Sequence, residues 1–123
     1  MAVRGRLFFT PNFAANLDSI ELFVGVEGKS AFQQLLTRLF DDICPQLSRF
    51  PLSGRSFLVH RARSREAAVL LERLHTILRK GDDIREFTVD EYVVLYLIRG
   101  RRLYFLAIKH HRQLSFDLQA FWT

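Results

Sequence analysis

Two apolar runs near the carboxyl end, joined by a short turn, constrain the fold of this chain more than any other feature. Tyr92–Ile98 and Leu103–Ile108 are rich in β-branched and aromatic residues, and Arg99–Arg101, with a central glycine, separates them. This arrangement predicts an antiparallel β-hairpin. Because both runs are apolar on both faces, we expect central strands that helices cover on at least one side.

Three further segments have the composition of short strands. Leu7–Phe9 is an apolar run of β-formers, and Ile84–Val89 alternates apolar with polar residues. Phe57–Val59 follows a loop rich in proline, serine and glycine and is a third, brief candidate for an extended segment. The sheet should therefore hold more strands than the carboxyl-terminal hairpin.

Two helices are predicted between the first strand and residue 50. Thr10 precedes a proline and should cap the first helix, which ends before Gly25. Ser30 has capping-box spacing to a glutamine three residues on, so we expect it to cap the second helix. Pro45 should end or kink that second helix. The short connection between the two helices predicts an antiparallel helical hairpin.

A third helix is predicted from Ser64 to Lys80, with Gly81 closing it. Its leucine-rich face should pack in the core, or else form the surface of a homodimer. The order of elements predicts an α+β fold in a single domain of residues 1–123. In that fold a small, twisted, mainly antiparallel sheet packs against the amino-terminal helical hairpin.

Composition narrows the class of protein. The chain has 123 residues, and 49% of them are hydrophobic, which fits one folded domain and not a disordered segment. No apolar run approaches the roughly 18 residues of a spanning helix, so we expect no membrane association. Cys44 is the only cysteine. A chain without a cysteine pair is typical of a reducing compartment, so we expect a cytoplasmic protein.

The net charge of +5 is unevenly distributed. Residues 1–50 hold five basic and five acidic residues, whereas residues 51–123 hold thirteen basic and eight acidic residues. Two windows in the second half, Arg55–Arg65 and Arg99–Arg112, contain no acidic residue. Such windows favour a polyanionic partner, either a phosphate backbone or an acidic protein, although either window alone is equally typical of a solvated surface.

No phosphate-binding loop, cysteine pair or zinc-binding helix motif occurs in the sequence, so we expect no metal and no cofactor. The group of residues best suited to catalysis is basic and aromatic. Arg85, Tyr96 and His110 are candidate catalytic residues for cleaving a phosphodiester, with Lys109 and Arg112 as further cations. An antiparallel meander can bring these residues to one face or edge of the sheet. The alternative is that the tyrosines only pack within the sheet.

Part of this sequence resembles the RelE/ParE superfamily of toxins. Members show an Arg-Glu strand, a Tyr-x-x-x-Tyr strand and a last strand that closes in basic-His-x-Arg-Gln; the corresponding segments here are Asp83–Phe87, Asp90–Ile98 and Leu103–Gln113. Phe50–Arg55 is similar to the Pro-x-x-Gly-Arg loop that follows the helical hairpin of the family. The helix at Ser64–Lys80 is a departure, since typical members pass almost directly from that loop to the Arg-Glu strand.

The resemblance implies a bacterial growth-inhibiting, plasmid-stabilising toxin of a type II toxin–antitoxin module, neutralised by a cognate antitoxin protein. Two activities occur on this fold, ParE-like poisoning of DNA gyrase and RelE-like cleavage of mRNA in the ribosome. The ending at residues 110–113 is more similar to the ParE branch, so a gyrase-directed toxin that is not an enzyme is the leading hypothesis. The alternatives are a ribosome-dependent endoribonuclease and a non-toxic binding module. Arg55, Lys109, His111 and Arg112 are the expected partner- or nucleic-acid-binding residues.

Overall fold

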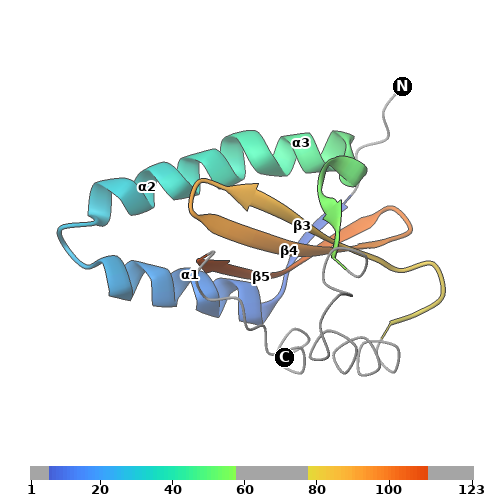
Figure 1. Ribbon diagram of the computed structural model, residues 1–123, viewed down its shortest axis with the longest axis horizontal. Helices are drawn as coiled ribbons and strands as arrows, with labels where there is room; N and C mark the ends of the chain where they lie inside the picture. Colours follow the sequence, from blue (N-terminus) through green and yellow to red (C-terminus); the bar gives the residue numbers. More distant parts are fainter. Residues whose placement is uncertain (1–5, 58–77, 111–123) are drawn as a thin grey trace.

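The computed structural model describes residues 6–57 and 78–110 of the chain, and within them the fold is α+β, as predicted. A five-stranded sheet has the order β1-β5-β4-β3-β2, in which β1 is parallel to β5 and all other neighbours are antiparallel. Figure 1 shows helix α1 (Pro11–Val24) and the longer helix that includes α2 (Lys29–Thr37) and α3 (Cys44–Arg49) as two rods joined at one end of the molecule. The strands are β1 (Arg6–Phe9), β2 (Arg55–Ser56), β3 (Asp83–Val89), β4 (Tyr92–Arg99) and β5 (Arg102–His110).

Helix α1 (Pro11–Val24) begins where the sequence predicts, and Thr10 ties its start to the sheet. The Thr10 hydroxyl accepts a bond from the Phe13 N–H (3.2 Å) and donates to the Phe105 carbonyl (3.0 Å). The Thr10 N–H also donates to the Phe105 carbonyl, at 3.1 Å. One residue therefore caps the helix and extends the contact between β1 and β5.

The predicted cap of the second helix is wrong. Helix α2 (Lys29–Thr37) begins one residue before Ser30, and its N-cap is Gly28, which makes no side-chain capping bond. The loop is so tight that a Cβ on Gly28 would lie 2.5 Å from the Cβ of Val24. Only glycine fits this approach of the two helices, and the steric constraint of the loop decides the helix start.

The helix does not end at Pro45. It continues from α2 through a π-helical segment (Arg38–Ile43) into α3 (Cys44–Arg49). In the wider turn the Cys44 N–H bonds to the Leu39 carbonyl, five residues back. Proline lacks an N–H, and a local change of helical register is one way to accommodate it. The irregularity lies where the sequence predicts it, but as a widened turn in a continuing helix.

The sheet has an apolar cluster on each face, which explains why β4 and β5 are apolar throughout. On the face covered by the helical hairpin, Tyr96 and Phe105 pack with α1, α2 and α3. On the opposite face Leu95, Leu97 and Leu106 belong to a second buried cluster. A bulge separates the two registers, since Leu95 pairs with Ala107 whereas Tyr96 pairs with Phe105. Leu106 is the extra residue of this bulge.

Two predictions about the middle of the chain differ from the structure or lie outside it. The extended segment is β2, two residues before the expected Phe57–Val59, because it pairs with β3 through Arg55 and Ser56. The third helix falls mostly outside the described residues, and Leu78–Lys80, which the structure describes, are not helical. In the ranges 6–57 and 78–110, none of the helices has both the length and the apolar character needed to span a bilayer.

Candidate functional site

Arg85 and Tyr96 lie directly opposite each other on β3 and β4, so their side chains share one face of the sheet. Both make polar contacts with the same loop. The Arg85 guanidinium donates to the Gly54 carbonyl at 2.7 Å, and its Nε donates to the Asp83 carboxylate at 2.9 Å. The structure therefore brings these two candidate residues together, and their common partner is the backbone of the loop after α3.

The Tyr96 hydroxyl is enclosed by that loop. It donates to the Pro51 carbonyl at 2.6 Å and accepts a bond from the Gly54 N–H at 2.9 Å, and the side chain has no exposed surface. Burial raises the pKa of this phenol. A Cβ on Gly54 would lie 2.5 Å from the Tyr96 hydroxyl and 2.6 Å from the Glu86 carbonyl oxygen, so only glycine permits this contact.

Arg55 belongs to the same region and points outward. Its guanidinium lies 3.2 Å from the Glu86 carboxylate, and the side chains are 64% and 2% exposed, respectively. The buried carboxylate anchors the arginine while most of the guanidinium stays in solvent. Most of the Arg55 side chain is therefore exposed to solvent, and its role as a binding residue stays a prediction.

His110 is the last residue of β5 and lies beside the start of β4. It pairs with Tyr92, whereas Arg85 pairs with Tyr96, so four residues, about 13 Å, separate the two positions along the strand. The His110 ring contacts the Tyr92 ring edge-on at 5.5 Å, and its Nε2 lies 3.3 Å from the Glu91 carboxylate. The structure therefore brings Arg85 and Tyr96 together but does not bring His110 to them.

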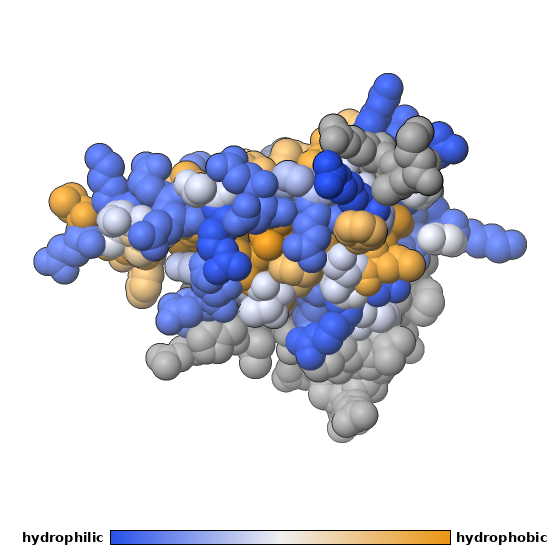
Figure 2. Space-filling view, turned by 90° about the horizontal axis from the view of Figure 1, so that it is seen from above, coloured by the Kyte–Doolittle hydropathy of each residue, from blue (hydrophilic) through white to orange (hydrophobic). Residues whose placement is uncertain are grey.

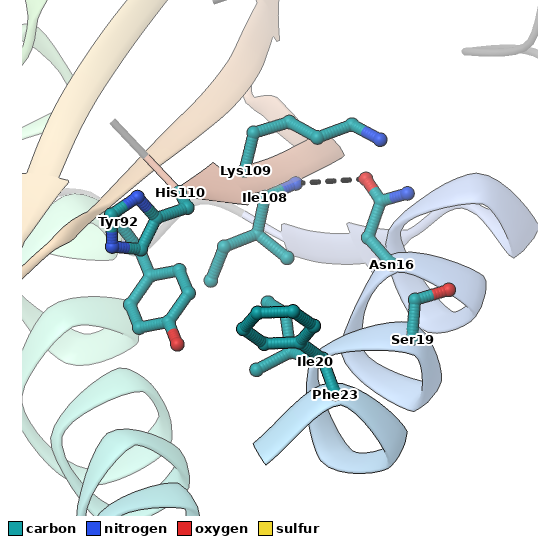
Figure 3. A pocket seen from close by; sticks show the side chains of 8 residues that line it. All are labelled: Asn16, Ser19, Ile20, Phe23, Tyr92, Ile108, Lys109 and His110. Carbon is teal, nitrogen blue, oxygen red and sulfur yellow. Dashed lines mark hydrogen bonds between the residues drawn. The ribbon is translucent and has the colours of Figure 1, made fainter. Parts of the chain in front are cut away.

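His110 and Lys109 instead border a pocket of about 540 Å³ between α1 and the end of β5. Figure 3 shows the Ile20 and Phe23 side chains of α1 facing Ile108 and Tyr92 across this space. Asn16, which is 8% exposed, accepts a hydrogen bond from the Ile108 N–H at 3.0 Å. The lining residues are Asn16, Ser19, Ile20, Phe23, Tyr92, Ile108, Lys109 and His110.

Asn16 is a pocket residue that the sequence did not predict. Its signal is position, because it lies three residues after Phe13 and four before Ile20, on the apolar face of α1. A polar residue at such a position needs a hydrogen-bond partner, and the Asn16 side chain finds it in the Ile108 N–H near the end of β5. Tyr92, at the same pocket, has its pKa raised by burial and by the neighbouring Glu91.

The end of the helical hairpin is conspicuously apolar on its outside. Leu22, Phe23 and Val26 are 82%, 91% and 91% exposed, although each is large and hydrophobic. Figure 2 shows hydrophobic side chains at the end of the molecule where the α1–α2 connection lies. Exposed apolar surface of this kind is typical of an interaction site. Phe23 joins this tip to the pocket.

The remaining candidates add little to either site. His111 and Arg112 lie outside the described residues. Over residues 6–57 and 78–110, no group of three or more histidine, cysteine, aspartate or glutamate side chains is placed to hold a metal ion. Burial raises the pKa of the Cys44 thiol to about 11, so the thiol is protonated at neutral pH and is a poor nucleophile.

Comparison with known proteins identifies the family. A family model described as the ParE toxin of the type II toxin–antitoxin system, parDE, matches residues 7–115. A search among curated proteins found no match. The family match spans β1, the helical hairpin and all of the sheet, so it covers both the Tyr96 loop contact and the His110 pocket. On this evidence the chain belongs to the ParE toxin family of type II toxin–antitoxin systems, whose toxins are paired with a cognate antitoxin.

Proposed function

We propose that this toxin inhibits growth by contact with DNA gyrase and that it does not cleave RNA. One observation carries the proposal. The Tyr96 hydroxyl is buried and engaged by Pro51 and Gly54, while His110 pairs with Tyr92, four residues or about 13 Å of strand away from Tyr96. Cleavage of a phosphodiester needs its acid, base and cationic groups within hydrogen-bond reach of one phosphate. Arg85, Tyr96 and His110 lack that convergence.

The structure also supports a place for the antitoxin. The exposed tip residues Leu22, Phe23 and Val26 form an apolar surface on the helical hairpin, and Phe23 also lines the pocket beside them. An amphipathic segment can bury its apolar face on such a surface. We infer that the cognate antitoxin docks there, with Lys109 at the pocket rim as a contact for acidic side chains.

A direct experiment separates the two activities of the family. Purified toxin is added to a gyrase supercoiling reaction, and transcript ends are sequenced after induced expression in cells. We expect loss of supercoiling, with no new transcript ends while growth stops. Codon-positioned transcript ends that disappear in a folded His110→Ala variant would overturn the proposal in favour of a ribosome-dependent endoribonuclease. Absence of any growth arrest would favour a non-toxic binding module.

A further inference from the structure

A second group of basic and aromatic side chains lies far from the pocket, where β1 pairs with β5. The parallel register places Arg6 opposite Arg102 and Phe8 opposite Tyr104. Residues two apart on a strand share a face, so these four side chains form a compact array. Tyr104 packs with the cluster of Leu95 and its neighbours, which places the array on the sheet face away from the helical hairpin. We call it the β1–β5 patch and include Arg101 from the adjoining turn.

The aromatic rings of the patch form one surface. The Phe8 and Tyr104 rings stack on each other, with their centroids 5.1 Å apart and their planes inclined by 19°. Phe8 is 37% exposed. The Arg102 guanidinium lies 5.9 Å from the Phe8 centroid, and the Arg99 guanidinium lies 5.9 Å from the Tyr104 centroid. Planar groups of both kinds therefore offer stacking surfaces to an incoming ring.

The charges of the patch are largely uncompensated. Arg99 is held by Asp82 through two hydrogen bonds of 2.9 and 2.7 Å. Arg6, Arg101 and Arg102 are exposed, and in the described ranges none of the three has an ion-pair partner. The patch thus presents three guanidinium charges beside the exposed ring of Phe8 and the half-buried ring of Tyr104.

This combination discriminates between polyanionic ligands. The carboxylates of an acidic peptide would pair with the arginines, but they have no planar ring system to stack on Phe8 and Tyr104. Duplex DNA keeps its bases stacked inside, and the patch offers a sheet face in place of a helix or ribbon for the major groove. Single-stranded nucleic acid uses both features, because its bases stack on aromatic rings and its phosphates pair with arginine.

We propose that the β1–β5 patch binds single-stranded nucleic acid, with Phe8 and Tyr104 stacking a base and Arg6, Arg101 and Arg102 contacting phosphates. This inference does not depend on the gyrase proposal. It also differs from an RNase site, since it needs neither Arg85 nor His110 and involves no cleavage. It adds a nucleic-acid contact to a toxin whose antitoxin surface lies on the opposite face of the sheet.

The test measures binding of the full chain to a fluorescein-labelled oligothymidylate of about 12 nucleotides, a length within the usual site size. Loss of one stacked base costs roughly 5- to 150-fold in affinity. We therefore expect Phe8→Leu, which keeps an apolar side chain but removes the ring, to weaken binding at least fivefold. Phe50→Leu, which removes an exposed ring in the connection after α3, is the matched control and should leave the affinity unchanged.

The charge contribution is read from the salt dependence. For three phosphate contacts on a single strand, the logarithm of affinity should fall with the logarithm of salt with a slope of about −2. The triple variant Arg6→Gln, Arg101→Gln, Arg102→Gln should lose nearly all of that slope. A triple variant with the same charge loss on the helical side, Lys29→Gln, Arg38→Gln, Arg49→Gln, should retain it. Thermal melts establish that each variant folds.

Three results would overturn the inference. An unchanged oligonucleotide affinity of Phe8→Leu would exclude stacking on Phe8. Equal losses of the salt slope in the two triple variants would show that net charge alone explains the binding. Displacement of the oligonucleotide by polyglutamate, with equal polyglutamate affinity in wild type and Phe8→Leu, would assign the patch to an acidic protein. If the triple variant of the patch does not fold, Arg101→Gln in the exposed turn replaces it and should lower the slope by about 0.7.

Discussion

At the scale of single residues, Tyr96 ties the loop after α3 to the sheet. Its hydroxyl has two backbone partners, the Pro51 carbonyl and the Gly54 N–H, and no contact with solvent. Removing the hydroxyl leaves both backbone groups unpaired. We expect Tyr96→Phe to lower the free energy of unfolding by about 1–3 kcal/mol, measured by denaturant titration, without abolishing growth inhibition by the folded protein.

Tyr92→Phe is the matched control for this prediction. The Tyr92 ring is only half-buried, so its hydroxyl remains accessible to water, and the change should stay within about 0.5 kcal/mol. Equal destabilisation by the two variants would show that the loop contact of Tyr96 contributes no stability of its own.

Asp82 gives the residue-scale prediction on pH. Its carboxylate is 2% exposed and is bonded to Arg99, and this contact lowers its pKa below the ordinary 3.8. A carboxyl whose pKa is lower in the folded than in the unfolded state stabilises the fold above its unfolded pKa, and the contribution disappears as pH falls through the folded pKa. We expect Asp82→Asn to cost about 1.5–3 kcal/mol near pH 7.

The test is the difference in unfolding free energy between wild type and Asp82→Asn, followed from pH 7 into acid. The difference should shrink below about pH 4, where the wild-type carboxyl begins to be protonated in the unfolded chain. Arg38→Gln, which removes an ion pair between two half-exposed side chains, should show a small difference at every pH. A constant difference for Asp82→Asn from pH 7 to the acid limit would contradict the assignment.

At the scale of elements, the α2–α3 helix depends on its apolar face and tolerates an irregular turn. Leu39 lies in the π-helical segment and Leu47 in α3, and neither has exposed surface. We expect Leu47→Ala to cost about 2–5 kcal/mol in unfolding free energy, because it leaves a cavity against the sheet. A loss below 1 kcal/mol would mean that α3 does not belong to the cooperative core.

Leu36 in α2 offers the control for that comparison. It is only partly buried at the border of the same cluster. Leu36→Ala should therefore cost distinctly less than Leu47→Ala, because the border of a core can be filled by water or by neighbouring side chains. Denaturant titration of both variants compares them directly.

At the scale of the whole molecule, the hairpin tip and the β1–β5 patch lie on different faces of the toxin. The apolar hairpin tip and its pocket lie on the helical side, and the arginine-rich patch lies on the other face at the β1 edge. If the antitoxin docks on the hairpin, Phe23→Ala should weaken its binding at least tenfold, which is the usual effect of losing an aromatic hot spot. Titration calorimetry with the purified cognate antitoxin measures the change.

Phe50→Ala is the control for antitoxin binding. Phe50 is 61% exposed, but it lies in the connection after α3, away from the hairpin tip. The variant should bind the antitoxin as the wild type does. Because Phe23 is 91% exposed, neither change should alter stability by more than about 0.5 kcal/mol. Equal antitoxin affinities for Phe23→Ala and wild type would move the docking site elsewhere.

Much of the fold was predictable because it depends on short-range patterns. The β4–β5 hairpin follows from two apolar runs around a glycine turn, and α1 follows from Thr10 and Pro11. Predictions from local sequence were wrong where contacts with a neighbouring element override the local preference. Ser30 has the spacing of a cap, yet the tight contact of Gly28 with Val24 starts α2 earlier.

The sequence by itself determined the α+β class, the first helix and the carboxyl-terminal strands, since these depend on composition and on periodicity within one segment. Only the tertiary structure decided which of the candidate residues meet. The register of β4 with β3 and β5 sets Arg85 beside Tyr96 and holds His110 about 13 Å away. The parallel pairing of β1 with β5 brings Arg6 and Phe8 to Arg102 and Tyr104, nearly a hundred residues later. Such contacts depend on chain topology, because strand order and register are set by packing between distant segments and leave no periodic trace in the sequence.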